Sequence, residues 1–202
     1  MITISLNEIR KHEPCVHGWR TLLDHLGKTQ ADDVRFPLTV VLDSNGLNDA
    51  LWCCRCLPQY DREWRLFAVW CARQVQHLMT DQRSIDALDV AERYANGEAT
   101  VEELTSARTA AGDAWYDAGA TAWGDSGNVL ATEWDTALAA AGGAEWDTAW
   151  DAWDASGAAA RATEWDASLA AAGDAALGTC KPEQAEEFRR VCNETEGRLT
   201  NK

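Results

Sequence analysis

Basic residues are nearly absent from one long segment of this 202-residue chain. Residues 101–178 hold two of them, Arg108 and Arg161, against 14 Asp and Glu, so the segment carries −12 of the total net charge of −15. Residues 1–100 carry −3, and residues 179–202 are neutral. Direct, non-specific nucleic-acid binding needs a basic surface that meets phosphates, so this charge pattern argues against it. An acidic segment with so few cations favours a basic partner protein instead.

The chain also lacks features that accompany enzymes, secreted proteins and membrane proteins. No apolar run is long enough to span a bilayer, and we expect no signal peptide. The glycines do not stand in the strand–turn–helix setting of a phosphate-binding loop. The four histidines are scattered, and Cys71 and His77 are not spaced as a nucleophile and its base. We therefore expect a cytoplasmic protein that is not an enzyme.

Seven cysteines are present, an odd number that favours reduced thiols over a disulfide framework. Cys53 and Cys56 have the spacing of metal ligands, and Cys15 with His17 would complete a zinc site. However, the sequence has no second Cys-x-x-Cys pair, and the first pair lies in an apolar helical pattern. Buried free cysteines are therefore the favoured interpretation, and we predict no metal and no cofactor. A zinc-supported binding domain stays open as an alternative.

The patterns that are present predict an all-α fold in three parts. Residues 1–100 are expected to form a compact helical domain, and residues 101–178 a stacked array of short Ala/Trp-rich helices. Residues 179–202 are expected to form a C-terminal helix. Whether the array forms a solenoid or packs on the first domain is left open. The tryptophans of the first domain are expected in or near its core: these are Trp19, Trp52, Trp64 and Trp70.

Capping residues indicate where several helices begin and end. Ser5 with Glu8, and Thr100 with Glu103, have the spacing of capping boxes that begin helices. Gly27 is a natural stop for the helix that precedes it.

Further helices are expected between these boundaries. The β-branched run at residues 38–42 is assigned to a short helix ending at Asn45-Gly46, because no second strand is available to pair with it. The other predicted helices cover residues 47–57, closed by Pro58, residues 61–79 and residues 84–95.

An acidic repeat marks the C-terminal half of the chain. The string Ala-Thr-Glu-Trp-Asp occurs at residues 131–135 and again at 162–166, and glycine-containing breaks divide the segment into helical pieces. Within residues 144–156, tryptophans share one helix face, and aspartates form a second ridge about 100° further round. We expect the tryptophans to pack on a neighbouring helix and the acids to bind the partner. The candidate partner-binding residues are Glu133, Asp135, Glu145, Asp147, Asp151, Asp154, Glu164 and Asp166.

The spacing of these acids decides whether the segment is able to imitate nucleic acid. One continuous helix over residues 101–178 would be about 117 Å long, which places its 14 acids roughly 8 Å apart. Duplex DNA carries one charge per about 1.7 Å of its axis. Folding the segment into about three stacked helices reduces the spacing to roughly 3 Å. Mimicry of a polyanion therefore requires a compact array.

Two stretches of sequence resemble known groups of proteins. Residues 83–100 (Arg-Ser-Ile-Asp-Ala-Leu-Asp-Val-Ala-Glu-Arg-Tyr-Ala-Asn-Gly-Glu-Ala-Thr), followed by an Ala-rich helix, resemble immunity proteins of bacterial polymorphic toxin systems. The whole layout, including residues 44–47 (Ser-Asn-Gly-Leu) and 49–53 (Asp-Ala-Leu-Trp-Cys), is similar to uncharacterised phage and prophage proteins with Ala/Trp/Asp repeats. Both resemblances imply an all-helical, non-enzymatic protein that binds and blocks something. A phage setting implies an inhibitor of a host defence nuclease or CRISPR complex, and a toxin setting implies neutralisation of a toxin.

Taken together, these patterns predict an inhibitor or immunity protein that binds a basic or nucleic-acid-binding protein through its acidic helical surface. The alternative is a structural module whose Ala and Trp faces assemble with further copies of the same chain. In the plainest interpretation, the acids only keep an Ala/Trp-rich helical array soluble.

Overall fold

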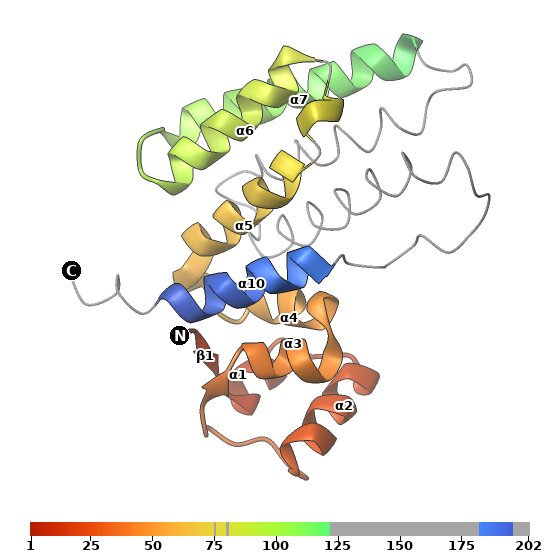
Figure 1. Cartoon of the computed structure of the whole chain (residues 1–202), viewed down its shortest axis with the longest axis vertical. Coiled ribbons are helices and arrows are strands. Elements are labelled where there is room, and N and C mark those ends of the chain that lie inside the picture. The colour runs from red at the N-terminus through yellow and green to blue at the C-terminus, as the bar shows by residue number, and fades with distance from the viewer. Residues whose placement is uncertain (75, 80, 122–181, 196–202) are drawn as a thin grey trace.

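The structure is a computed structural model that describes residues 1–74, 76–79, 81–121 and 182–195, together called the helical body below. The helical body is mostly α-helical, with one very small antiparallel sheet (Figure 1). In chain order its elements are β1 (Thr3–Ile4), α1 (Leu6–Arg10), α2 (Val16–Leu26), β2 (Phe36–Pro37), α3 (Thr39–Asn45), α4 (Leu47–Cys54), η1 (Pro58–Tyr60), α5 (Asp61–Gln74), η2 (Gln76–Leu78), α6 (Gln82–Ala95), α7 (Val101–Thr121) and α10 (Pro182–Glu194).

Both predicted capping boxes are confirmed. Before α1, the Ser5 N–H donates to Glu8 Oε2 at 2.7 Å, and the Glu8 N–H donates to Ser5 Oγ at 3.3 Å. Before α7, the Thr100 N–H donates to Glu103 Oε2 at 2.7 Å, and the Glu103 N–H donates to Thr100 Oγ1 at 3.2 Å. Each box satisfies two backbone N–H donors that would otherwise have no partner at the start of the helix.

The predicted glycine stop at Gly27 is confirmed, because this residue ends α2 with φ = 62°, in the left-handed region that glycine adopts without strain. The short helix expected near residues 38–42 is confirmed as α3. The expectation that no strand is available for pairing in this region was wrong, since the strand pair β1–β2 exists and β2 lies just before α3. Ile4 of β1 faces Phe36 of β2, and Thr3 faces Pro37. Two-residue strands are too short for the alternating pattern that reveals a strand in a sequence.

Two predicted helices are shorter than expected. Helix α4 ends at Cys54, three residues before the predicted end, and Pro58 begins the 3₁₀ turn η1 instead of closing α4. A proline at the start of a helix leaves no hydrogen bond unmade, which explains its place there. Helix α5 ends at Gln74, and the turn η2 follows where a continuous helix to residue 79 was predicted.

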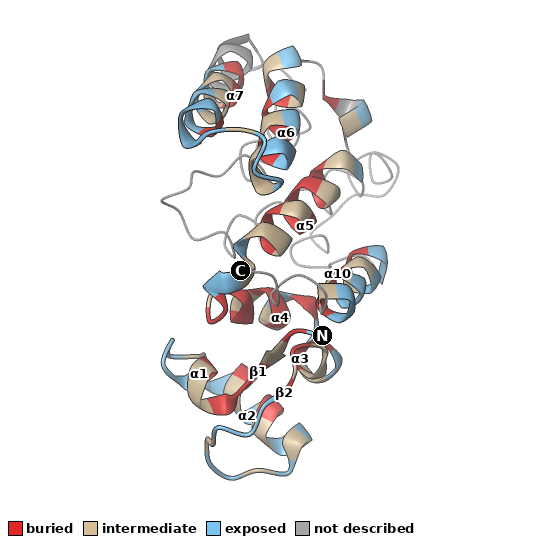
Figure 2. Ribbon diagram, turned by 90° about the vertical axis from the view of Figure 1, so that its left-hand side faces the viewer, coloured by how far each residue is buried: buried red, intermediate tan, exposed pale blue. Residues whose placement is uncertain are grey.

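The main core forms where α10 packs against α3, α4 and α5 (Figures 1 and 2). Phe188 of α10 is fully buried, stacked on Trp64 with ring centroids 5.9 Å apart and edge-on to Phe67 at 5.5 Å. The backbone N–H of Ile2 also donates to the carbonyl of Cys192 at 2.7 Å. Residues from both ends of the helical body therefore complete one core.

The first-domain tryptophans lie in or beside this core, as predicted. Trp64 is fully buried, and Trp19, Trp52 and Trp70 are half-buried against the core cluster. The far end of the molecule is the α6–α7 pair, which α5 connects to the rest (Figure 1). Helix α7 contributes buried residues Leu104, Ala111 and Ala114 to that end.

Candidate functional site

The predicted acidic binding surface lies outside the described residues. All eight candidate partner-binding acids fall between residues 133 and 166. The tryptophan ridge of residues 144–156 falls there too. The partner-binding role of the acids and the packing of the tryptophans therefore stay predictions. Only the first part of the acidic segment, residues 101–121, is described, as helix α7. On α7 the side chains of Glu102, Glu103 and Asp113 are exposed.

Most Lys and Arg side chains of the helical body form ion pairs with carboxylates of the same body. Arg73 Nη2 contacts Asp89 Oδ1 at 2.7 Å and Glu92 Oε2 at 2.9 Å, and Arg35 Nη1 contacts Glu8 Oε1 at 3.0 Å. At least eight of the fourteen described Lys and Arg residues form such ion pairs: Lys28, Arg35, Arg62, Arg73, Arg83, Arg93, Arg189 and Arg190.

Hydrogen bonds within two of these pairs lower the pKa of the acid. The Thr100 N–H and the Arg93 guanidinium lower the pKa of Glu103. A hydrogen bond from Arg83 lowers the pKa of Asp81 in the same way. Most of these pairs are exposed, so each contributes little to stability. Their main consequence is electrostatic, because each ion pair neutralises a positive charge of the helical body locally.

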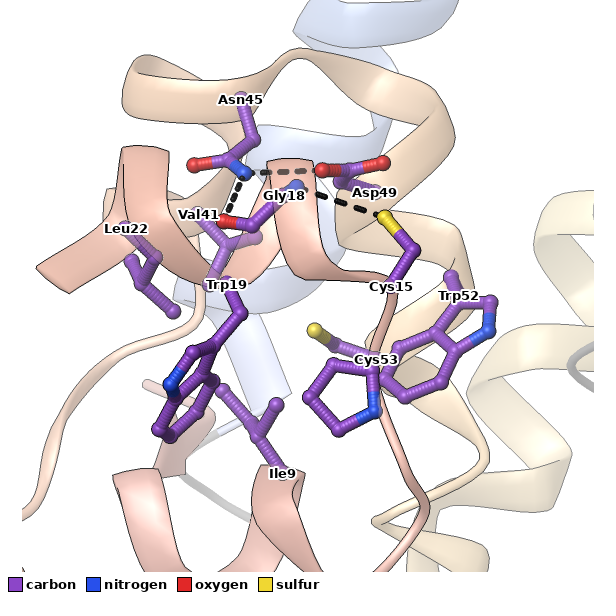
Figure 3. A pocket seen from close by; sticks show the side chains of 11 residues that line it. Ile9, Cys15, Gly18, Trp19, Leu22, Val41, Asn45, Asp49, Trp52 and Cys53 are labelled. Carbon is purple, nitrogen blue, oxygen red and sulfur yellow. Dashed lines mark hydrogen bonds between the residues drawn. The ribbon is translucent and has the colours of Figure 1, made fainter. Parts of the chain in front are cut away.

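A pocket of about 80 Å³ lies between α1, α2, α3 and α4 (Figure 3). Its wall is mostly carbon, and polar groups stand at one edge, which is the usual composition of small-molecule sites. Trp19 and Trp52 supply aromatic surface from α2 and α4. The remaining lining residues are Ile9, Pro14, Cys15, Gly18, Leu22, Val41, Asn45, Asp49 and Cys53.

A hydrogen-bond network fixes the polar edge of this pocket. Asn45 Nδ2 donates to the carbonyl oxygen of Gly18 and to Asp49 Oδ2, both at 2.8 Å. At the N-terminus of α2, the Gly18 N–H donates to Cys15 Sγ at 3.3 Å, so the thiol is the helix cap. The close approach of α2 to α4 depends on glycine, because a Cβ at position 18 would lie 2.5 Å from Asp49 Oδ2.

Sequence reasoning did not find this pocket. Its signals were weak ones: a glycine inside a helical pattern at Gly18, and a thiol at a position where helices usually have Ser, Thr, Asp or Asn. Neither residue type identifies a pocket without knowledge of which helix packs beside it.

The described cysteines are free thiols, and five of them are buried: Cys53, Cys54, Cys56, Cys71 and Cys192. Cys15 is exposed. The zinc alternative needed Cys15, His17, Cys53 and Cys56 to meet, and they do not form a metal-binding group. Within the helical body, no three or more His, Cys, Asp or Glu side chains are placed to hold a metal ion.

Burial affects the ionisation of two of the thiols. It raises the pKa of Cys53 well above its ordinary value. It also raises the pKa of Cys192 to about 12. Both thiols are therefore neutral at physiological pH and behave as apolar side chains.

Comparison with other proteins identifies no relative. No protein-family model, no curated protein and no solved structure matches this chain. Among the helices described here, none is both long and apolar enough to cross a membrane.

Proposed function

We propose that this protein is a non-enzymatic binding protein that blocks a basic or nucleic-acid-binding target through the acidic surface of residues 101–178. The resemblances seen in the sequence suggest two settings. In the first, the protein is a phage or prophage inhibitor, such as an anti-CRISPR protein, and its target is a host defence complex. In the second, it is an immunity protein and its target is a toxin.

The imbalance between the two parts of the chain carries this proposal. The helical body neutralises eight of its cations internally, whereas residues 122–178 contain ten acids and one base, Arg161. One base is too few to neutralise ten acids, so this segment keeps a net charge of −9. Such a dense negative charge attracts basic proteins over distances of about one Debye length, roughly 8 Å in physiological salt.

Imitation of nucleic acid adds a structural condition to the proposal. The acids reach a DNA-like density only if residues 101–178 form a stacked array of short helices. Helix α7 supports this arrangement, since the first 21 residues of the segment are helical and pack along α6. The remaining helices of the array are part of the proposal.

The test is a competition experiment with a defined probe. A short arginine-rich peptide is bound to fluorescent duplex DNA, and the protein is titrated in at low salt. Release of the DNA is expected, with an apparent affinity that falls as salt rises. In the charge-reversed variant Asp147→Lys, Asp151→Lys and Asp154→Lys, release is expected to weaken at least about tenfold.

A matched control separates local charge from total charge. Asp24, Asp33 and Glu98 are exposed, and their side chains form no ion pair with any described residue. Their reversal to Lys changes the net charge from −15 to −9, as the reversal at 147, 151 and 154 does. The control variant is expected to retain most of the competition. Equal loss in both variants would contradict a specific acidic surface.

Self-assembly is the competing outcome. A structural module that associates through Ala and Trp faces should form oligomers that persist in high salt, because apolar contacts are not screened. Light scattering at low and high salt distinguishes this result from capture of a basic target. Salt-resistant oligomers without any release of DNA would replace the proposed function with the structural one.

A further inference from the structure

We propose that the pocket between α1, α2, α3 and α4 is a small-molecule site, and that Cys15 at its polar edge is the attachment point for a soft electrophile carrying a small apolar group. This inference is independent of the acidic segment, because every residue it uses belongs to the helical body. It assigns the molecule a covalent modification site in addition to its proposed binding surface.

The size and lining of the pocket define the group that it accepts. An enclosed apolar cavity of about 150 Å³ is known to hold a benzene molecule. The pocket here measures about 80 Å³ and is open on one side. It therefore accepts a branched aliphatic group or the inner part of a single ring. The indoles of Trp19 and Trp52 line it, which favours apolar and aromatic groups over charged ones (Figure 3).

The second thiol of the pocket points to the same class of ligand. Cys53 is 3% exposed, and its side chain makes no hydrogen bond to a described residue. Figure 3 shows its Sγ directed into the pocket, toward the side where Trp19 lies. A buried, polarisable sulfur that faces open space gains favourable contacts when a carbon or aromatic group fills that space.

Cys15 is placed to react with such a ligand. It is exposed, whereas the other described cysteines are buried, so it is the accessible thiol of the helical body. Its hydrogen bond from the Gly18 N–H fixes the sulfur at the polar edge of the pocket, near Asp49 (Figure 3). The thiolate form of an accessible cysteine is the reactive nucleophile.

The reaction that this geometry favours is conjugate addition to an α,β-unsaturated carbonyl compound. The Cys15 thiolate attacks the β-carbon, a carbon–sulfur bond forms, and the carbon–carbon π bond breaks. The electron pair moves to the α-carbon, which takes a proton from water. No oxidant or reductant is needed. The apolar substituent of the electrophile enters the pocket and brings the reactive carbon to the sulfur, which raises the local concentration of the reactants.

The experiment compares N-methylmaleimide with N-phenylmaleimide, using the full chain and a free small thiol, glutathione. Peptide mass spectrometry measures modification of Cys15 separately from each other cysteine. The ratio of the phenyl rate to the methyl rate at Cys15 is expected to exceed that ratio for glutathione about tenfold, from burial of the ring. An equal ratio for Cys15 and glutathione would overturn the proposal.

A pair of variants on α3 locates the effect in the pocket. Val41 lines the pocket, and Val40 beside it on the same helix does not. Val41→Phe is expected to fill the pocket and to lower the phenyl-to-methyl rate ratio at Cys15 to the ratio measured for glutathione. Val40→Phe is expected to keep the preference. If Val41→Phe fails to fold by circular dichroism, the maleimide comparison on the unmodified chain decides the question alone.

Discussion

Substitution of Gly18 by alanine gives the most direct test of how α2 packs against α4. At an open position inside a helix, alanine is more favourable than glycine by about 1 kcal/mol, because glycine loses more backbone entropy on folding. At Gly18 the added Cβ would lie 2.5 Å from Asp49 Oδ2 and 3.3 Å from Cys15 Sγ. The first distance is too short for any real contact, so the Asp49 carboxylate has to move.

The cost of that movement exceeds the gain in helix propensity. Asp49 Oδ2 accepts a hydrogen bond from Asn45 Nδ2, which also holds the carbonyl oxygen of Gly18. A hydrogen bond to a charged group contributes about 1.5–3 kcal/mol, and the lower end suits a half-buried pair. Subtracting about 1 kcal/mol of propensity leaves Gly18→Ala destabilising by roughly 0.5 kcal/mol.

Gly112 provides the matched control. It lies inside α7, and a Cβ there would meet nothing within 4 Å. Gly112→Ala should therefore stabilise the protein by about 1 kcal/mol, the opposite sign for the same chemical change. Urea unfolding followed by circular dichroism measures both variants. If both alanines raise the midpoint equally, the close approach of α2 to Asp49 is refuted. In an Asp49→Ala background, the penalty at Gly18 should disappear.

Two further predictions concern α10. In urea unfolding, Phe188→Ala should destabilise the protein by about 3–5 kcal/mol, because it removes a fully buried ring that packs on Trp64 and Phe67. Arg190 is exposed and serves as the control, and Arg190→Ala should destabilise the protein by under about 0.5 kcal/mol. Burial raises the pKa of Cys192 from 9.0 to about 12, so the unfolded chain loses this proton first as pH rises. The free energy of unfolding should decrease between about pH 9 and about pH 12, by roughly 4 kcal/mol at most. Cys192→Ala should reduce this dependence on pH. An unchanged dependence would contradict the raised pKa of Cys192.

Local signals explain what could be predicted about the fold. The capping boxes at Ser5 and Thr100 and the stop at Gly27 depend on residues within one helical turn, so the sequence alone specifies them. The end of α4 at Cys54 was missed because the apolar pattern continues beyond it, through the buried residues Cys56 and Leu57. The contact of Phe188 with Trp64 joins residues far apart in the chain, which no local pattern reports.

The two candidate sites differ in the same way: composition specifies the acidic segment, whereas tertiary packing forms the pocket. A charge count was sufficient to identify the acidic segment, because the feature is compositional. The pocket at Cys15 arises where four helices meet, and its key contact is the approach of Gly18 to Asp49. Glycine inside a helical pattern was the available signal, and it specifies neither the partner helix nor the space left between them.

The position of α10 in the core also has a consequence for synthesis of the protein. Trp64 and Phe67 are synthesised early. Phe188, whose ring packs on theirs, is synthesised only after the whole acidic segment. The same holds for Cys192, whose carbonyl oxygen accepts a hydrogen bond from the Ile2 N–H. At about 5–20 residues per second, the stretch between residues 121 and 192 takes roughly 4–14 s to translate. During that interval a nascent chain exposes an aromatic surface while a strongly negative polymer emerges beside it. The charge that is proposed to capture a target would also repel neighbouring nascent chains when the core is still open.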